Sequence, residues 1–157
     1  MKPSVYIETT IPSYYTARPN RDVVIAGHQA TTREWWDTRV NRFDGFISQL
    51  VIDEAASGDP EAARQRLAVL RPFPLLALRD DASKLADEFI KSRSLPTKAA
   101  RDALHIAIAA VHGMHFLVTW NCTHIANAEI ADSIAEICAE HGVECPVICT
   151  PEELMGT

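Results

Sequence analysis

The sequence predicts an α/β protein, a three-layer α/β/α sandwich with a mainly parallel sheet of about five strands. Short segments rich in β-branched residues alternate along the chain with longer segments of helical periodicity. Glycine, proline and capping residues stand between them and mark where one element ends and the next begins. Such alternation favours a parallel sheet with helices on both faces. We expect one domain over residues 1–157, because this length fits a single hydrophobic core.

The first half of the chain begins with a strand over residues 4–8, where Val5 and Ile7 alternate with Tyr6 and Glu8. Glu8 ends this strand, and Pro12 predicts a turn after it. The expected elements that follow are a helix over 22–40, a strand over 45–47, a helix over 49–57 between an N-cap at Ser48 and a stop at Gly58, and a helix over 60–70 behind Asp59.

The second half continues the alternation after a break at Pro72 and Pro74. The expected elements are a strand over 75–78, a helix capped by Asp80 or Asp81 that runs through residue 91, a helix over 97–113 capped by Thr97, a strand over 115–119, a helix over 126–140 closed by Gly142, a strand over 146–149 and a short segment over 151–155. The helix over 97–113 is almost entirely apolar, so we expect it to be buried.

Composition excludes several classes of protein. A hydrophobic fraction of 47% and a charged fraction of 23% are those of a soluble globular protein. No apolar run reaches the roughly 20 residues of a membrane span, and the N-terminus lacks the apolar stretch of a secretory signal, so we expect a cytoplasmic protein with no membrane partner. The net charge of −6 means that any contact with RNA or DNA is local.

Local positive charge is present in two clusters, which we interpret mainly as solvated faces. They consist of Arg18, Arg21, Arg33, Arg39 and Arg42, and of Lys91, Arg93, Lys98 and Arg101. The cysteines raise a different alternative, a zinc site formed by Cys145, Cys149 and His141. We do not favour it, because the chain has no C-x-x-C pair and residues 145–149 have the pattern of a buried strand.

Polar residues converge on one edge of the predicted sheet. Glu8 lies at the carboxyl end of the first strand, and Asn121 lies two residues beyond Thr119 at the end of another. In open parallel sheets, sites form beyond the carboxyl ends of the strands. Helical spacing turns Glu54 toward the apolar face and Asp53 toward water, and it places Asp102 on the covered side of its helix.

An acid on an apolar face must be neutralised or paired. Taken one at a time, Glu54 and Asp102 are explained equally well by an ion pair with arginine. Asn121 is explained equally well as the cap of the following helix. The joint placement of these residues at one rim favours a metal site instead. Carboxylate oxygens suit Mg²⁺ or Mn²⁺ rather than zinc.

At this point the chain resembles the PIN-domain nucleases, and among them the VapC-type toxins of type II toxin–antitoxin systems. The resemblance extends over nearly the whole length. It is carried by the segments Val5-Tyr6-Ile7-Glu8-Thr9-Thr10, Ile52-Asp53-Glu54, Arg101-Asp102-Ala103-Leu104-His105-Ile106-Ala107 and Leu117-Val118-Thr119-Trp120-Asn121.

The resemblance implies a metal-dependent endoribonuclease that hydrolyses RNA phosphodiester bonds. The acids of the family fall on Glu8, Glu54 and Asp102, which would hold Mg²⁺ or Mn²⁺, and on Asn121, which would orient a water molecule or the phosphate. Glu8 stands where the family usually has Asp, and Asn121 stands where it has an acid, so one side chain is longer and one charge is missing. Whether one metal ion binds or two stays open.

The same resemblance suggests further contacts. Thr9 and Thr119 either bind the scissile phosphate or are ordinary threonines at strand ends, and the expected partners are RNA, an antitoxin protein and a second copy in a homodimer. By its position just beyond Asn121, His124 is a further candidate for the phosphate contact. His105 either orients Asp102, binds the metal, or is a core histidine bonded to a backbone carbonyl, and we favour the last. A group of aromatic residues, which comprises Trp35, Trp36, Tyr14 and Tyr15, suggests base stacking or a protein interface, and we favour the interface.

Two alternative functions remain open. One is a non-catalytic PIN-like module that binds RNA or protein with a weakened metal site. The other is a metal-dependent phosphatase of small molecules, because carboxylates at strand ends serve there too. The chain contains neither G-x-G-x-x-G nor G-x-x-x-x-G-K-[ST], so the two commonest nucleotide-binding loops are excluded.

Overall fold

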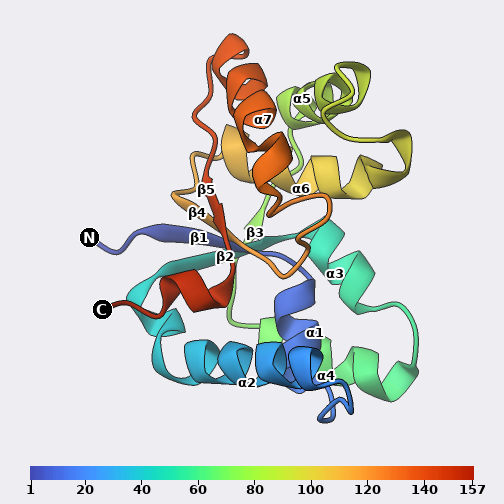
Figure 1. Cartoon of the computed structure of the whole chain (residues 1–157), viewed down its shortest axis with the longest axis vertical. Coiled ribbons are helices and arrows are strands. Elements are labelled where there is room, and N and C mark those ends of the chain that lie inside the picture. The colour runs from blue at the N-terminus through green and yellow to red at the C-terminus, as the bar shows by residue number, and fades with distance from the viewer.

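The computed structural model describes residues 1–157 and has the predicted α/β/α architecture (Figure 1). Five parallel strands form one sheet in the order β3-β2-β1-β4-β5. The strands are β1 (Ser4–Ile7), β2 (Asp44–Ser48), β3 (Leu75–Leu76), β4 (Phe116–Val118) and β5 (Val147–Cys149). The prediction of fold class is confirmed, and the sheet is parallel throughout.

Two layers of helices cover the sheet. On one face lie α1 (Thr10–Thr16), α2 (Val23–Thr38) and α4 (Pro60–Leu70), and on the other lie α5 (Asp80–Lys91), α6 (Ala100–Val111) and α7 (Ala128–Glu140), while α3 (Gln49–Ala55) follows β2 at the edge where β1 ends (Figure 1). Three short 3-10 helices complete the chain, η1 (Val40–Arg42), η2 (Thr97–Ala99) and η3 (Pro151–Leu154).

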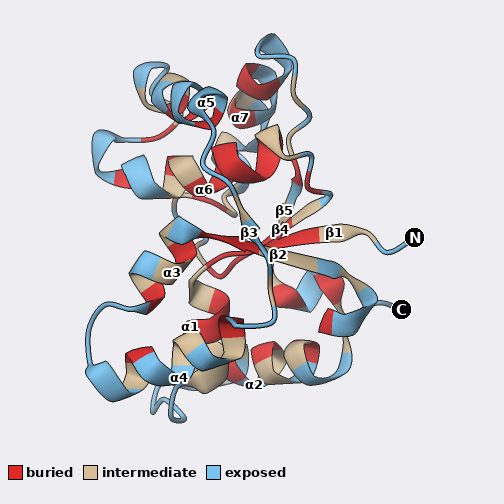
Figure 2. Cartoon of the chain, turned by 180° about the vertical axis from the view of Figure 1, so that it is seen from behind, coloured by how far each residue is buried: buried red, intermediate tan, exposed pale blue.

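The hydrophobic core lies along the central strands, which are buried on both sides (Figure 2). Val5, Tyr6 and Ile7 of β1 are 0% exposed. The apolar helix α6 packs against this strand layer with Ala103, Ile106 and its neighbours fully buried, as its composition predicts. β1 is therefore held rigidly, and so are the residues that directly follow it.

Several local predictions are confirmed by the capping geometry. Ser48 caps α3, and Asp59 caps α4 in front of Pro60, as predicted, and the Asp22 side chain adds a cap at the start of α2 that was not predicted. Gly142, with φ of +71°, follows the C-cap of α7 in the left-handed conformation that ends helices, whereas α3 already ends at Ala55, before Gly58.

Other local predictions are wrong. Pro12 does not form a turn but lies in α1, where its missing N–H is harmless because the first N–H groups of a helix have no partner within it. Neither Asp80 nor Asp81 caps α5, whose N-cap is Arg79. The segment over 97–113 divides into η2 and α6, and Thr97 makes no capping hydrogen bond.

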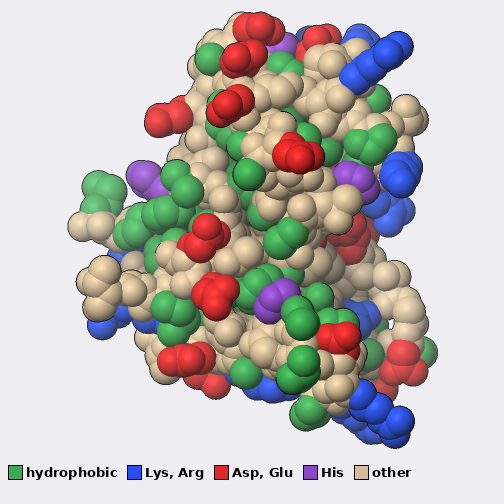
Figure 3. Space-filling view, in the orientation of Figure 1, with side chains coloured by type: hydrophobic (Ala, Val, Ile, Leu, Met, Phe, Trp, Pro, Cys, Tyr) green, Lys and Arg blue, Asp and Glu red, His purple; other side chains and the backbone are tan.

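None of the helices combines the length and the apolar composition that crossing a membrane would require. On the face drawn in Figure 3, Asp and Glu side chains are spread from top to bottom, while Lys and Arg lie mainly along the outline. This distribution agrees with the net charge of −6.

Candidate metal centre

The candidate site lies where the strand order of the sheet reverses. From β1 the sheet continues to β2 and β3 on one side and to β4 and β5 on the other. Such a reversal opens a crevice at the carboxyl ends of the two strands that flank it. Glu8 directly follows β1 and Thr119 directly follows β4, and the Glu8 N–H donates to the Val118 carbonyl over 3.1 Å. The sheet therefore fixes the backbone of both residues at its central edge.

Glu8 is almost completely buried, with only 4% of its surface exposed. One carboxylate oxygen, Oε1, accepts hydrogen bonds from the Thr119 hydroxyl at 2.7 Å, from the Thr10 N–H at 3.1 Å and from the Thr10 hydroxyl. The second oxygen, Oε2, receives no protein hydrogen bond. Only two side-chain nitrogen or oxygen atoms are both buried and without a hydrogen-bond partner, and they belong to Trp35 and Arg39. Oε2 of Glu8 also lacks a partner, so it is not fully buried.

Glu54 repeats this arrangement from a different element. Its α3 position turns it inward while Asp53 is exposed, as helical spacing predicts. Oε1 accepts the Thr9 hydroxyl at 2.6 Å and His105 Nε2 at 2.6 Å, whereas Oε2 receives no protein hydrogen bond. Each of the two acids therefore has one oxygen held by the protein and one oxygen left for a ligand.

The environment favours the ionised form of Glu54. Burial by itself would raise the pKa of this carboxyl group, but the hydrogen bond and charge of His105, the hydrogen bond from Thr9 and the charge of Arg101 outweigh it, so the pKa is lowered below its usual value. Arg101 is exposed and belongs to the second basic cluster. An ionised, partly desolvated carboxylate with a free oxygen is suited to bind a cation.

His105 continues the hydrogen-bond chain into the core, and its ring is fully buried. Nδ1 lies 2.6 Å from the Tyr6 hydroxyl, which lies 2.7 Å from the Ser48 hydroxyl. The expectation of a backbone carbonyl partner for His105 is therefore wrong: both ring nitrogens bond to side chains. Burial raises the pKa of Tyr6 far above its usual value, so its hydroxyl stays protonated.

One assignment of hydrogens satisfies every donor in this chain. Ser48 donates to Tyr6, Tyr6 donates to Nδ1 of His105, and Nε2–H of His105 donates to Glu54. In this arrangement Nε2 of His105 faces Glu54 and Nδ1 faces Tyr6, so both ring nitrogens have a partner.

Glu8, Glu54 and His105 could together hold a metal ion. They form the only group of three or more His, Cys, Asp or Glu side chains whose ligand atoms all lie within 4.8 Å of one another. Because both nitrogens of His105 are already engaged, the atoms best placed for an ion are Oε2 of Glu8 and Oε2 of Glu54. If an ion binds there, His105 would orient its ligand Glu54, in the way that outer residues orient metal ligands. The zinc alternative at the cysteines has no such group.

Asp102 and Asn121 lie outside this group of three. Asp102 is in the first turn of α6, and its Oδ2 lies 3.1 Å from Nδ1 of His124. The Asn121 side-chain oxygen accepts the His124 N–H at 3.0 Å. Both residues thus meet at His124, in the loop between β4 and α7. The hydroxyls of Thr9 and Thr119 donate to the two glutamates, and a contact with phosphate stays a prediction for them.

Sequence reasoning missed three residues that build the site. They are Tyr6, Ser48 in its role as a hydrogen-bond donor, and Thr10. A signal for Tyr6 was available, because residues two apart on a strand share a face and Tyr6 precedes Glu8 by two. No comparable signal marks the pairing of Thr10 with Trp120, whose N–H donates to the Thr10 hydroxyl at 2.8 Å.

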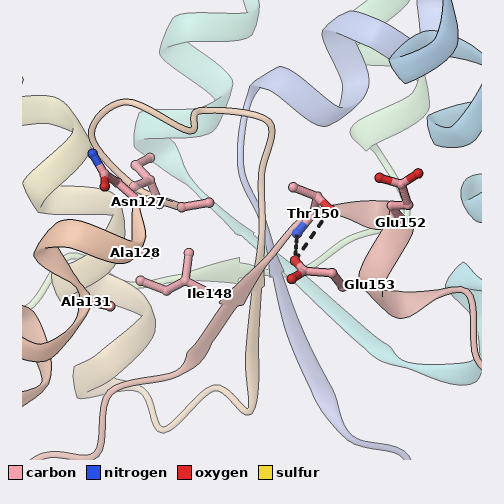
Figure 4. A pocket seen from close by; sticks show the side chains of 9 residues that line it. Asn127, Ala128, Ala131, Ile148, Thr150, Glu152 and Glu153 are labelled. Carbon is pink, nitrogen blue, oxygen red and sulfur yellow. Dashed lines mark hydrogen bonds between the residues drawn. The ribbon is translucent and has the colours of Figure 1, made fainter.

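The largest cavity, about 460 Å³, is separate from the acids. It lies beside the end of β5, where Figure 4 shows Asn127, Ala128, Ala131 and Ile148 on one side and Thr150, Glu152 and Glu153 on the other. Glu153 is bonded to Thr150 as part of a capping box. None of Glu8, Glu54 and His105 lines this cavity, so it is not part of the candidate metal site.

In comparisons with known proteins, the sequence matches no protein-family model and no curated protein.

Proposed function

We propose that this protein is a metal-dependent endoribonuclease that hydrolyses RNA phosphodiester bonds, and that it is the toxin of a toxin–antitoxin pair. The observation that carries the nuclease proposal is that the carboxylates of Glu8 and Glu54 have the same pattern of hydrogen bonds. Each has Oε1 held by hydrogen bonds and Oε2 free, and both lie at the reversal point of the sheet. The toxin assignment, the antitoxin and the homodimer depend on the sequence motifs alone.

The donor atoms indicate the metal. Two carboxylate oxygens, with Asp102 as a third acid nearby in the fold, form a set of hard oxygen ligands that suits Mg²⁺ or Mn²⁺. Zinc prefers nitrogen and sulfur ligands, and the only histidine of the group has both nitrogens occupied. When bound, the ion would supply an activated water molecule and relief of the charge that develops on the phosphate.

The residues of the chain have distinct roles in this proposal. Glu8 and Glu54 hold the ion, Thr10 and Thr119 fix the Glu8 carboxylate, and His105 fixes the Glu54 carboxylate. The fixed geometry means that little reorganisation is needed when ion and substrate bind. Asp102 contributes the third negative charge, directly or through water.

Two further residues face the substrate side in this proposal. The Asn121 oxygen is already bonded to the His124 N–H, so its amide NH₂ is the group left to donate to a phosphate oxygen. His124, held against Asp102, is a second candidate for that contact.

A second candidate function is the non-catalytic module that binds RNA or protein. The observation that favours it is the engagement of Asn121 and Asp102 with His124, which leaves only two acids in the group of three. The two functions differ in their dependence on metal.

The test is cleavage of RNA by the purified protein with Mg²⁺ or Mn²⁺. We expect cleavage that stops with a chelator and is lost in Asp102→Asn, while the control Asp132→Asn, at an exposed position on α7, stays active. Unchanged cleavage by Asp102→Asn would remove that residue from the catalytic set. If calorimetry detects no metal binding and no RNA is cut, the module is the correct function.

A further inference from the structure

A stack of aromatic rings stands directly beside the acids. The ring of Trp120, next in sequence to Thr119, lies parallel to the ring of His28 with centroids 4.0 Å apart and an interplanar angle of 12°. Tyr14 is also stacked with Trp120, at 6.2 Å and 15°. These three residues, the Trp120 stack, come from α1, from α2 and from the loop after β4, which meet at the carboxyl edge of the sheet (Figure 1).

Trp120 is held in place at two points. Its backbone N–H donates to the Thr10 hydroxyl at 2.8 Å, and its indole N–H donates to the Thr32 hydroxyl at 2.7 Å. Because the same Thr10 hydroxyl donates to Glu8, a single residue connects the stack to the candidate metal site. Trp120 itself is only 8% exposed, while His28 and Tyr14 are half-buried.

Three arginines lie on α2 and on the chain that joins it to α1, and one of them, Arg18, lines a cavity with Asp59 and Glu61. The chain between α1 and α2 is tied to α2 by hydrogen bonds from Gln29 to the Arg18 carbonyl at 3.2 Å and from Arg33 to the Ala17 carbonyl at 3.0 Å. None of Arg18, Arg21 and Arg33 forms an ion pair. Arg39 and Arg42 of the same predicted cluster lie elsewhere, in a cavity with Pro3 and Phe116 at the opposite end of the strands.

The aromatic group suggested by the sequence is also divided. Tyr15 stacks on Trp36 at 4.9 Å, and its hydroxyl donates to Asp37, so it belongs to a separate surface. Tyr14 alone faces the site. Partly exposed aromatic rings connected to the candidate metal site are suited to single-stranded nucleic acids, because unstacked bases pack on aromatic faces.

We propose that the Trp120 stack is a subsite for a nucleobase of single-stranded RNA, with His28 and Tyr14 as the rings that the base contacts. This inference rests on the proposed function, since it assigns to the same site a preference for unpaired RNA. The base of a nucleotide adjacent to the scissile phosphate packs on the stack. A duplex cannot bind in this way, because its bases are already stacked on one another.

The test measures binding rather than cleavage. A fluorescent single-stranded RNA of about ten nucleotides is titrated with the full-length protein in the presence of a chelator, so that it is not hydrolysed. We expect Tyr14→Ala and His28→Ala to weaken binding by about fivefold or more. The matched control is Tyr15→Ala, which removes a neighbouring aromatic ring from the other surface and leaves affinity unchanged.

Three further measurements separate stacking from folding and from charge. His28→Phe keeps an aromatic ring and is expected to restore affinity. An oligonucleotide of the same length with abasic sugars keeps the phosphates, and its binding is expected to be insensitive to Tyr14→Ala. In the wild type, tryptophan fluorescence is expected to fall when the RNA with bases is added and not when the abasic one is added.

The inference is overturned if Tyr14→Ala and His28→Ala bind the RNA as the wild type does, if duplex RNA binds equally well, or if no single-stranded RNA binds. Metal-dependent cleavage together with any of these results would leave the proposed function in place and remove only the subsite. If RNA binds by base stacking but is not cleaved, the subsite stays and the nuclease proposal is removed, which leaves a binding module with no nuclease activity.

Discussion

His105 on α6 and Glu54 on α3 are joined by a hydrogen bond of 2.6 Å between Nε2 and Oε1. This bond connects a half-buried acid to a fully buried chain that continues through Tyr6 to Ser48. It determines which oxygen of Glu54 is left for a ligand, and several predictions depend on it.

Replacing His105 should weaken metal binding without removing a ligand. In His105→Gln the amide cannot span both Tyr6 and Glu54, so the Glu54 carboxylate loses its fixed orientation. We expect Mn²⁺ affinity to fall by about 10–100-fold, as for other residues that orient metal ligands. Calorimetric titration measures this, with His112→Gln, at the C-terminal end of the same helix, as the control. Equal affinities for wild type and His105→Gln would show that His105 has no such role.

Removing the Tyr6 hydroxyl should lower stability. Tyr6→Phe keeps the ring but leaves the buried His105 Nδ1 and the Ser48 hydroxyl without their partner. We expect a loss of about 1–3 kcal/mol in the free energy of unfolding, measured by urea denaturation. Tyr15→Phe is the matched control, because that hydroxyl bonds only to the exposed Asp37, and a change within about 0.5 kcal/mol is expected. Similar losses in the two variants would argue against a buried network.

The Thr10 hydroxyl should prove important in two ways, since it donates to Glu8 and accepts the N–H of Trp120. Thr10→Val has nearly the same shape but removes both bonds, and we expect it to cost about 1–3 kcal/mol of stability and to weaken metal binding. Thr10→Ser keeps the hydroxyl and should restore both properties. If valine and serine variants behave alike in denaturation and metal titration, the hydroxyl is not the cause.

The lowered pKa of Glu54 links stability to pH. Because the pKa in the folded state lies below the unfolded value of about 4.3, the contribution of this group is present above about pH 4.3 and is lost as pH falls through the folded pKa. Glu54→Gln should therefore be less stable than the wild type near neutral pH, and this difference should shrink as the solution becomes acidic. Urea denaturation over a pH series measures it.

The control for this prediction is Asp53→Asn, at the exposed neighbouring position, where the side chain bonds only to Gln49. Its stability difference from the wild type should stay small and nearly constant over the same series. A difference for Glu54→Gln that does not change with pH would mean that the folded protein does not favour the ionised form of this carboxyl group.

The predictions made from sequence succeeded where they depended on periodicity and failed where they depended on contacts. Helical spacing placed Glu54 inward and Asp53 outward, and strand ends placed Glu8 beside Thr119, because both rules follow from backbone geometry. The partners of His105 were not predictable, because β1, α3 and α6 are brought together only by tertiary packing.

Predictions from single residues also failed where one residue type is compatible with two local structures. Pro12 indicates a turn in isolation, yet the first turn of a helix tolerates proline, and α1 begins two residues earlier. Thr97 is a good capping residue by type, but a 3-10 turn precedes α6 and makes the cap unnecessary. Asp102 and Asn121 reach the predicted rim, but both are engaged with His124 rather than with the glutamates.

The central claim is that Glu8 and Glu54 bind a divalent metal ion through their free oxygens. The most direct test is titration of the purified protein with Mn²⁺, followed by electron paramagnetic resonance, for the wild type, Glu54→Gln and the adjacent control Asp53→Asn. We expect the wild type and Asp53→Asn to bind Mn²⁺ with the same affinity and Glu54→Gln to lose this binding. Binding that survives unchanged in Glu54→Gln, or that is absent from the wild type, would contradict the account.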